Sequence, residues 1–486
     1  MRTRAKWLGR IINTSIVLGT IVFTAAQAQN AYTSPNSFGS YYRPFATDSL
    51  WNVKPVNPVL GTNIVKKSLI NLDWIPSIDD GAYSVKVFMA KAGDASMTVV
   101  GKAGTSGVGD PDTGNFRTIT IPRWPADVAP ATGEDGHAEI IDTVSGVIHS
   151  FYQLRKVGDK WTATMYSWTR VDGRGFGNPS HWSQGARSSG VAPTAGLIRL
   201  HELTDNRPHY RHALAMSLPA HTLANGITHP SYVYPATTAD TSAWLNTGVI
   251  PLGARLMLPA SFDTSTLSTG PLRKIANTLK LYGAYVVDRN YDTSFRIYVE
   301  NGANFNIMPN GVWSPRVVAD LEKIRAGLRE MVSASHFDDE NGAAKASLAI
   351  KGWGDAKSLL SMRGDWLVPG TSTRGNGAYD TWLEAVSFPK TATKISLVNF
   401  SNGISKVAGS MPAPKTPMRF TAVTTGGAMI RMQLWYGSSL AYDSGSLANG
   451  SFVSFPWPTA PWVSVKLLAQ SGVNTASSAR GILVPE

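Results

Sequence analysis

The chain of 486 residues carries 45 Lys and Arg against 33 Asp and Glu, and it contains no cysteine. An apolar share of 43% and a charged share of 16% exclude a disordered or fibrous protein, and the length predicts two or three domains. The missing cysteines exclude thiol catalysis, thiolate-bound metals and disulfide bonds. The formal charge of +12 leaves nucleic acid, a membrane surface or an acidic polymer as expected partners.

The first 28 residues have the pattern of a secretory signal peptide. Four basic residues stand within 1–10, a mostly apolar stretch covers 11–26, and small residues lead to a cleavage site after Ala28. We therefore expect a secreted or periplasmic protein. A membrane anchor fits less well, because the apolar stretch is short and is interrupted at 13–15. Removal of the four basic residues leaves 41 − 33 = +8. Because the mature chain is expected outside the cytoplasm and has no later stretch long and apolar enough to span a bilayer, nucleic acid and membrane insertion are not expected.

The mature chain has the pattern of a mainly β protein. Short runs rich in Val, Ile, Thr, Tyr and Trp alternate with clusters of Gly, Pro, Asn and Asp, as is typical of sandwiches and barrels. Predicted strands cover 82–90, 117–122, 137–142, 147–155, 161–171, 284–288 and 295–300. Apolar residues at helical spacing predict two helices, at 271–282 and 314–332. Gly283 is expected to end the first, and Ser314 to cap the second.

These elements predict a division into domains. We expect a β-sandwich or jelly-roll-like main domain at 29–310, a helical connector at 311–361 and a smaller C-terminal β-sandwich at 362–486. In the last of these, Trp457 and Trp462 stand beside prolines, which predicts exposed aromatic rings in loops. Carbohydrate binding is a hypothesis for this domain, because aromatic rings suit the faces of sugars.

A hairpin around the turn 143–146 is the most informative segment. With these four residues as the turn, Glu139 lies opposite Ser150 and His137 opposite Tyr152. One sheet face then carries His137, Glu139 and Tyr152, which we predict as catalytic residues for proton transfer at a sugar ring. The alternative is a half-exposed strand whose polar residues only face water, and a shift of one residue would exchange the two faces.

The residues expected to bind the substrate lie on or near the opposite face and in the Gly-rich passage 172–190. Glycines allow a loop to approach a ligand closely, and arginines can hold an anion. The passage is not a phosphate-binding loop, because it lacks the Gly-Lys-Ser/Thr sequence that ends one. The predicted substrate-binding residues are His149, Arg155, Tyr166, Trp168, Arg170, Arg174, His181, Trp182 and Arg187.

The histidines that follow this passage do not predict a metal site. His201 and Glu202 begin the pattern of a zinc protease, but Asp205 stands where the second histidine belongs. His201, His209 and His212 remain able to gather in space. No metal and no cofactor are predicted.

Segments of the main domain share a further pattern. They are Ser49-Leu50-Trp51-Asn52, 136–142, 211–215, 250–256 and 281–288. Together they resemble a family of exported bacterial β-rich proteins that often carry carbohydrate-binding modules. The resemblance covers roughly 45–300. It implies that the main domain is one unit and associates it with polysaccharides, and it assigns no catalytic residue.

These patterns favour an exported enzyme that cleaves an extracellular, acidic polysaccharide. A His/Tyr pair near a cation suits β-elimination of a uronic acid, so a lyase is preferred over a glycoside hydrolase. Hydrolysis by Glu139 with Asp142 or Glu202 is weaker, because Glu139 and Asp142 fall on opposite faces. The alternative is a non-catalytic glycan-binding or cell-surface protein. A peptidase or esterase has the least support, because this region has no Gly-x-Ser-x-Gly between a strand and a helix. The sequence leaves the sugar, the linkage and the oligomeric state open.

Overall fold

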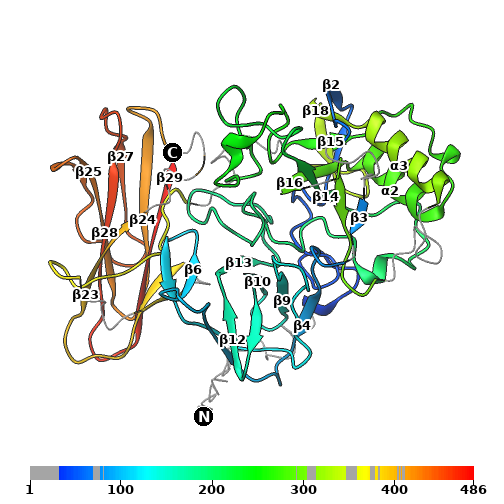
Figure 1. The fold of residues 1–486 in the computed structure, drawn as a ribbon. Helices are drawn as coiled ribbons and strands as arrows, with labels where there is room; N and C mark the ends of the chain where they lie inside the picture. The colour runs from blue at the N-terminus through cyan, green and yellow to red at the C-terminus, as the bar shows by residue number, and fades with distance from the viewer. Residues whose placement is uncertain are drawn as a thin grey trace, which may run out of the picture.

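The computed structural model describes residues 32–68, 77–79, 81–291, 293–303, 314–345, 358–372, 378–380, 384–401, 404, 407 and 411–486. The predicted signal peptide at 1–28 lies outside the described residues. The described chain is mainly β, as predicted, with strands in several sheets and the helices α2 (Gly270–Leu281) and α3 (Pro315–Gly327). Figure 1 shows the helices on one side of the molecule and the C-terminal strands on the other.

Two large sheets form the centre of the first part of the chain. The six-stranded sheet has the order β4-β9-β10-β13-β6-β7, with bounds Val87–Ala90, Ala138–Asp142, Val147–Tyr152, Met165–Arg170, Val108–Asp110 and Asn115–Arg117. The seven-stranded sheet has the order β2-β18-β15-β16-β14-β17-β3, with bounds Val59–Ile64, Arg329–Ser333, Arg255–Met257, Ala284–Asn290, Leu214–Pro219, Arg296–Tyr298 and Ser77–Asp79.

Two smaller sheets complete this part of the chain. The four-stranded sheet β11-β12-β5-β8 joins Arg155–Val157, Lys160–Ala163, Met97–Gly101 and Ile119–Ile121. The three-stranded sheet β1-β19-β20 joins Lys54–Val56, His336–Asp338 and Ala344–Lys345.

Three hydrophobic cores hold these layers together. Ile141 and Ile148 of the six-stranded sheet pack with Val287 of the seven-stranded sheet in one core. The other face of the seven-stranded sheet packs on α2 and α3. The other face of the six-stranded sheet packs on the four-stranded sheet. Because both faces of the large sheets are covered, strands such as β9 and β14 are buried along their whole length.

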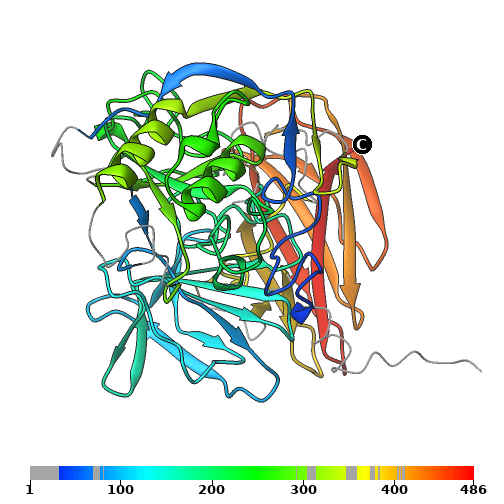
Figure 2. The ribbon, with the colours of Figure 1, turned by 90° about the vertical axis from the view of Figure 1, so that its right-hand side faces the viewer.

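The C-terminal strands form a β-sandwich with a core of its own. One sheet has the order β21-β22-β29-β24-β27, with bounds Ala378–Asp380, Ala385–Phe388, Ser477–Pro485, Pro417–Thr425 and Phe452–Pro456. The other has the order β23-β28-β25-β26, with bounds Ser396–Ser401, Ser464–Gln470, Met429–Tyr436 and Ser439–Asp443. Figure 2 shows the sandwich, in orange and red, beside the rest of the chain. The domain boundaries at 310 and 361 stay a prediction.

Three local predictions can be compared with the structure. The helix at 271–282 is confirmed as α2, and Gly283 follows it with a φ of 68°. The predicted helix at 314–332 is longer than the observed α3, which ends at Gly327. The residues after it form β18, which pairs with β2 and β15. The predicted exposure of Trp462 is confirmed, because this residue is 51% exposed. The same prediction for Trp457 is wrong, because this residue is 2% exposed and lies in the sandwich core.

Candidate functional site

The predicted hairpin register is confirmed. Glu139 on β9 pairs with Ser150 on β10, which in turn pairs with Ser167 on β13. The His137 and Tyr152 rings have centroids 5.8 Å apart. This face points into the space between the two large sheets rather than into water, and burial raises the pKa of Tyr152.

Glu139 is fully buried and holds a loop. Its carboxylate accepts hydrogen bonds from the Ser150 hydroxyl and from both the backbone N–H and the hydroxyl of Thr194. Burial raises the pKa of Glu139 to about 7, although these three hydrogen bonds act in the opposite direction. In this position Glu139 fixes the backbone around Thr194 and does not meet solvent.

Arg187 reaches the same group from the Gly-rich passage. Its Nη1 lies 3.3 Å from Oδ2 of Asp288, and its guanidinium lies 3.9 Å above the ring of Tyr298. Burial, together with the charge of Arg187, holds the pKa of His137 well below its usual value. Asp135 lies 3.9 Å from Nε2 of His137. The structure thus brings the predicted catalytic residues and Arg187 together and adds two carboxylates that sequence reasoning missed.

The other predicted substrate-binding residues do not join this group. His149, Tyr166 and Trp168 lie in or against the core between the six-stranded and four-stranded sheets, and burial lowers the pKa of His149 to about 4. The remaining arginines are held by nearby acceptors: Arg155 by the Gly133 carbonyl, Arg170 by Asp172, and Arg174 by Asp48.

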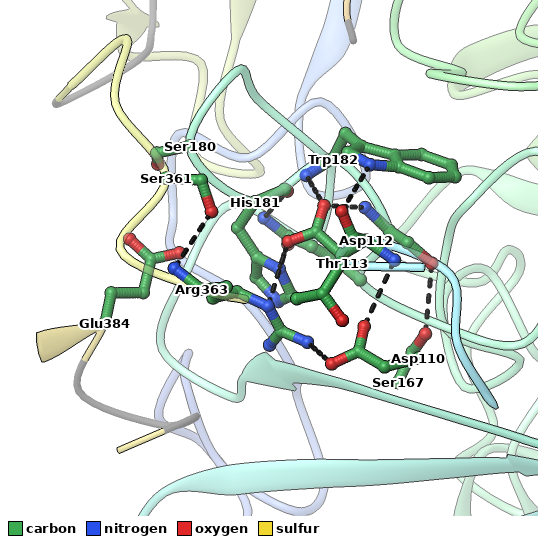
Figure 3. Close-up of polar contacts among 12 residues, drawn as sticks. Asp110, Asp112, Thr113, Ser167, Ser180, His181, Trp182, Ser361, Arg363 and Glu384 are labelled. Atoms are coloured by element: carbon green, nitrogen blue, oxygen red, sulfur yellow. Dashed lines mark hydrogen bonds and ion pairs between the residues drawn. The ribbon is translucent and has the colours of Figure 1, made fainter. Parts of the chain in front are cut away.

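His181 and Trp182 belong to a buried ion network between the first part of the chain and the sandwich (Figure 3). At its centre the guanidinium of Arg363, which is 1% exposed, pairs with Asp110 and Asp112. Burial alone would raise the pKa of Asp112, but the hydrogen bond with His181 and the charge of Arg363 lower it. This network joins the two parts of the chain, and within it His181 is 4% exposed with both ring nitrogens in hydrogen bonds, to Asp112 and to the Trp168 carbonyl.

A cavity of about 350 Å³ lies elsewhere, between residues of 35–52 and of 194–212. A hydrogen bond of 2.7 Å from the Ala213 N–H to the Trp51 carbonyl holds the two segments together. The ionisable lining residues are Arg43, Arg199, Arg207, Arg211, His201, His212, Glu202 and Asp205. A volume of this size is typical of small-molecule sites.

Two carboxylates, the partly buried Glu340 and the buried Glu300, orient two of these arginines. The guanidinium of Arg43 forms a fork with Glu340 at 3.0 and 2.9 Å, and Nε of Arg199 lies 2.8 Å from Glu300. Nη1 of Arg211 also donates to Glu340 at 3.3 Å, Arg211 lines the cavity, and Arg207 is exposed. Burial and the charge of Arg43 lower the pKa of Arg211, so an anion beside it would be stabilised.

The pKa values of two lining histidines are shifted in opposite directions. Burial lowers the pKa of His201, so its imidazole is neutral at pH 7. Burial would also lower the pKa of His212, but Glu202 at 3.1 Å raises it. The same contact lowers the pKa of Glu202 to about 2 against the effect of its burial. Environments that push two pKa values apart in this way are typical of acid–base sites.

Tyr42 stands beside the neutral histidine. Its ring meets that of His201 edge-on, with centroids 5.2 Å apart. Sequence reasoning considered His201 and His212 as metal ligands and Glu202 as a partner of Glu139 in hydrolysis, and it missed Tyr42, Arg43 and Arg211. The clustering of histidines near 201–212 was the only local signal, because the other half of the lining comes from a segment about 160 residues earlier.

Comparisons with known proteins place this chain in no family. No model of a protein family matches it, and no curated protein is similar to it in sequence. Among solved structures, the accessory secretory protein 1, 2 and 3 structure from Streptococcus pneumoniae is 9% identical over 26% of this chain and 96% of that one, with a TM-score of 0.18. A family 16 carbohydrate-binding module-2 is 14% identical over 27% of this chain and 90% of that one, with a TM-score of 0.15. Scores this low carry no argument.

In the part of the chain that the structure describes, no helix has the length and apolar character needed to cross a membrane. Nor do three or more His, Asp or Glu side chains gather there in a way that could hold a metal ion.

Proposed function

We propose that the arginine-rich cavity binds an acidic sugar of an extracellular polysaccharide and cleaves the chain by β-elimination. The observation that carries this proposal is a neutral histidine, His201, beside Tyr42 in a cavity lined by arginines. The proposal keeps the chemistry that the sequence favoured but moves it from the buried face of the hairpin to the cavity.

The arginines supply the recognition. A guanidinium binds a carboxylate with two parallel hydrogen bonds, which fixes the sugar in orientation. Glu340 occupies the fork of Arg43 and Glu300 holds Arg199, which leaves the exposed Arg207 and Arg211, whose contact with Glu340 is through Nη1, for the substrate. Their charge would neutralise the uronate carboxylate and make the neighbouring C5–H bond more acidic.

His201 and Tyr42 supply the proton transfers. The neutral imidazole of His201 takes the proton from C5, and the electron pair forms the C4=C5 double bond as the C4–O4 bond breaks. The Tyr42 hydroxyl gives its proton to the departing O4. The proton on His201 then returns to the Tyr42 phenolate, which restores both residues.

Hydrolysis is less well supported at this cavity. A glycosidase needs one protonated carboxyl group as its acid. Glu202, with a pKa of about 2, is ionised and paired with His212, and Asp205 is paired with Lys274. Neither carboxyl group is free to donate a proton.

Incubation with polygalacturonate, alginate and neutral xylan tests the proposal. We expect the ultraviolet absorbance of an unsaturated uronate only with an acidic polymer, and a rate about 10²–10⁴-fold lower in His201→Gln. His336→Gln is the matched control, because His336 pairs with Asp338 and does not line the cavity. Binding of an acidic polymer without this absorbance would favour the non-catalytic alternative. A failure of Arg211→Gln to weaken binding or cleavage would remove the cavity from the function.

A further inference from the structure

The sheet β23-β28-β25-β26 of the C-terminal sandwich has one face outside the core. Leu397, Leu434 and Leu467 on its strands are buried in the sandwich core. Because side chains alternate along a strand, their neighbours point to the opposite face. Figure 1 shows β23, β25 and β28 on the side of the sandwich away from the sheets of the first part of the chain.

Aromatic rings gather around one lysine on this face. Phe400 on β23 pairs with Lys466 on β28, and Lys466 pairs with Gln433 on β25, so the three residues form one row across the sheet. Phe400 is 60% exposed. The Lys466 Nζ lies 5.7 Å from the ring centroid of Phe400 and 5.6 Å from that of Trp435.

The charge of this row is positive. Arg431 and Gln433 both bind Asp443, with Nε of Arg431 2.7 Å from Oδ1 and Nε2 of Gln433 2.8 Å from Oδ2. The carboxylate of Asp443 is therefore paired with Arg431 and Gln433. Within the described ranges, no carboxylate lies within ion-pair distance of Lys466, which faces the two rings instead.

We infer that this face is a second saccharide-binding site, separate from the cavity, that holds a chain of acidic sugars across Phe400, Lys466 and Trp435. Aromatic rings with an accessible surface pack against the apolar faces of sugar rings. An ammonium between two such rings is placed to meet a sugar carboxylate, which a neutral glycan would not offer. Phe400 is exposed, and Lys466 and Trp435 beside it are partly buried, so the face offers an accessible ring with a cation at its side.

Retardation of the full chain in native gels that contain polygalacturonate, alginate or neutral xylan tests the inference. We expect retardation by an acidic polymer and, in Phe400→Ala and in Lys466→Gln, an apparent affinity roughly tenfold lower. Phe452→Ala is the matched control and should behave as wild type. Phe452 is 54% exposed under the guanidinium of Arg419 at 4.6 Å, but it lies on the other sheet.

Two readouts separate this site from the cavity. Cleavage of short uronic-acid oligosaccharides should be unchanged in Phe400→Ala, and retardation should be unchanged in His201→Gln. The inference is overturned if Phe400→Ala and Lys466→Gln are retarded like Phe452→Ala, if xylan retards the wild type as strongly as the acidic polymers, or if no polymer retards it. Loss of cleavage in His201→Gln would still support the cavity in each of these cases.

Discussion

Replacement of Arg363 by methionine removes the central cation of the buried network in Figure 3. The guanidinium is 1% exposed, and it pairs with two carboxylates, on Asp110 and Asp112, that are each 3% exposed. Without it, Asp110 keeps a hydrogen bond from the Asp112 N–H, and Asp112 keeps those from the backbone N–H groups of Trp182 and Ser183, but both buried carboxylates lose their cation. Removal of one partner from a buried ion pair costs about 3–5 kcal/mol, and we expect Arg363→Met to lower the free energy of unfolding by this amount.

Urea unfolding of the full chain, followed by tryptophan fluorescence, measures the effect. Arg431→Met is the matched control, because Arg431 also pairs with an aspartate through two nitrogens but is 39% exposed at its side chain. Its loss should cost about 0–1 kcal/mol. A second substitution, Asp110→Asn, in the Arg363→Met background should recover part of the loss by removing an unpaired charge. Equal destabilisation by Arg363→Met and Arg431→Met would refute the reasoning.

Three further predictions concern other buried positions. Glu139 has a pKa of about 7 in the folded protein, against 4.5 ordinarily, so the folded state binds its proton more tightly than the unfolded state. The free energy of unfolding of the wild type should therefore fall by about 3 kcal/mol as the pH rises from 4.5 to 7. Unfolding of Glu139→Gln across this range should lack that slope, and an identical slope would contradict the assignment. Trp457→Ala should cost about 3–5 kcal/mol and Trp462→Ala less than about 1 kcal/mol in urea unfolding, and similar costs would argue against the burial of Trp457. Gly196→Ala should destabilise by more than about 1 kcal/mol and weaken saccharide binding, because a Cβ there would lie 2.5 Å from the Trp51 ring at a φ of 68°. Unchanged stability and binding would exclude this packing.

The hairpin of β9 and β10 was predictable because its determinants are local. The turn 143–146 sets which residues pair, and strand alternation then sorts Glu139 and Ser150 to one face. The end of α3 was not predictable, because Met331 fits helical spacing as well as strand spacing. The residues after α3 form a strand instead of a further helical turn because β18 pairs with β2 and β15, which begin more than 60 residues away in the sequence.

The role of a polar residue on a strand was harder to predict than its face. The alternation that sorted His149, Tyr166 and Trp168 correctly could not show that a second sheet covers them. The same limit applies to His137 and Glu139, which a sheet of distant strands buries. A polar residue on a strand meets either water or another layer, and only the packing of layers distinguishes the two.

The sequence by itself determined the β-rich composition, the hairpin pairing, the helix α2 and the presence of a C-terminal sandwich, because these follow from local periodicity and turn chemistry. Only the tertiary structure decided where a site can lie. The cavity needs Tyr42 and Arg211 on one surface, and the binding face needs Phe400 and Lys466 on neighbouring strands. Each of these pairs is separated by more than 60 residues, and the hydrogen bonds and core contacts that join them form only when the whole chain has folded.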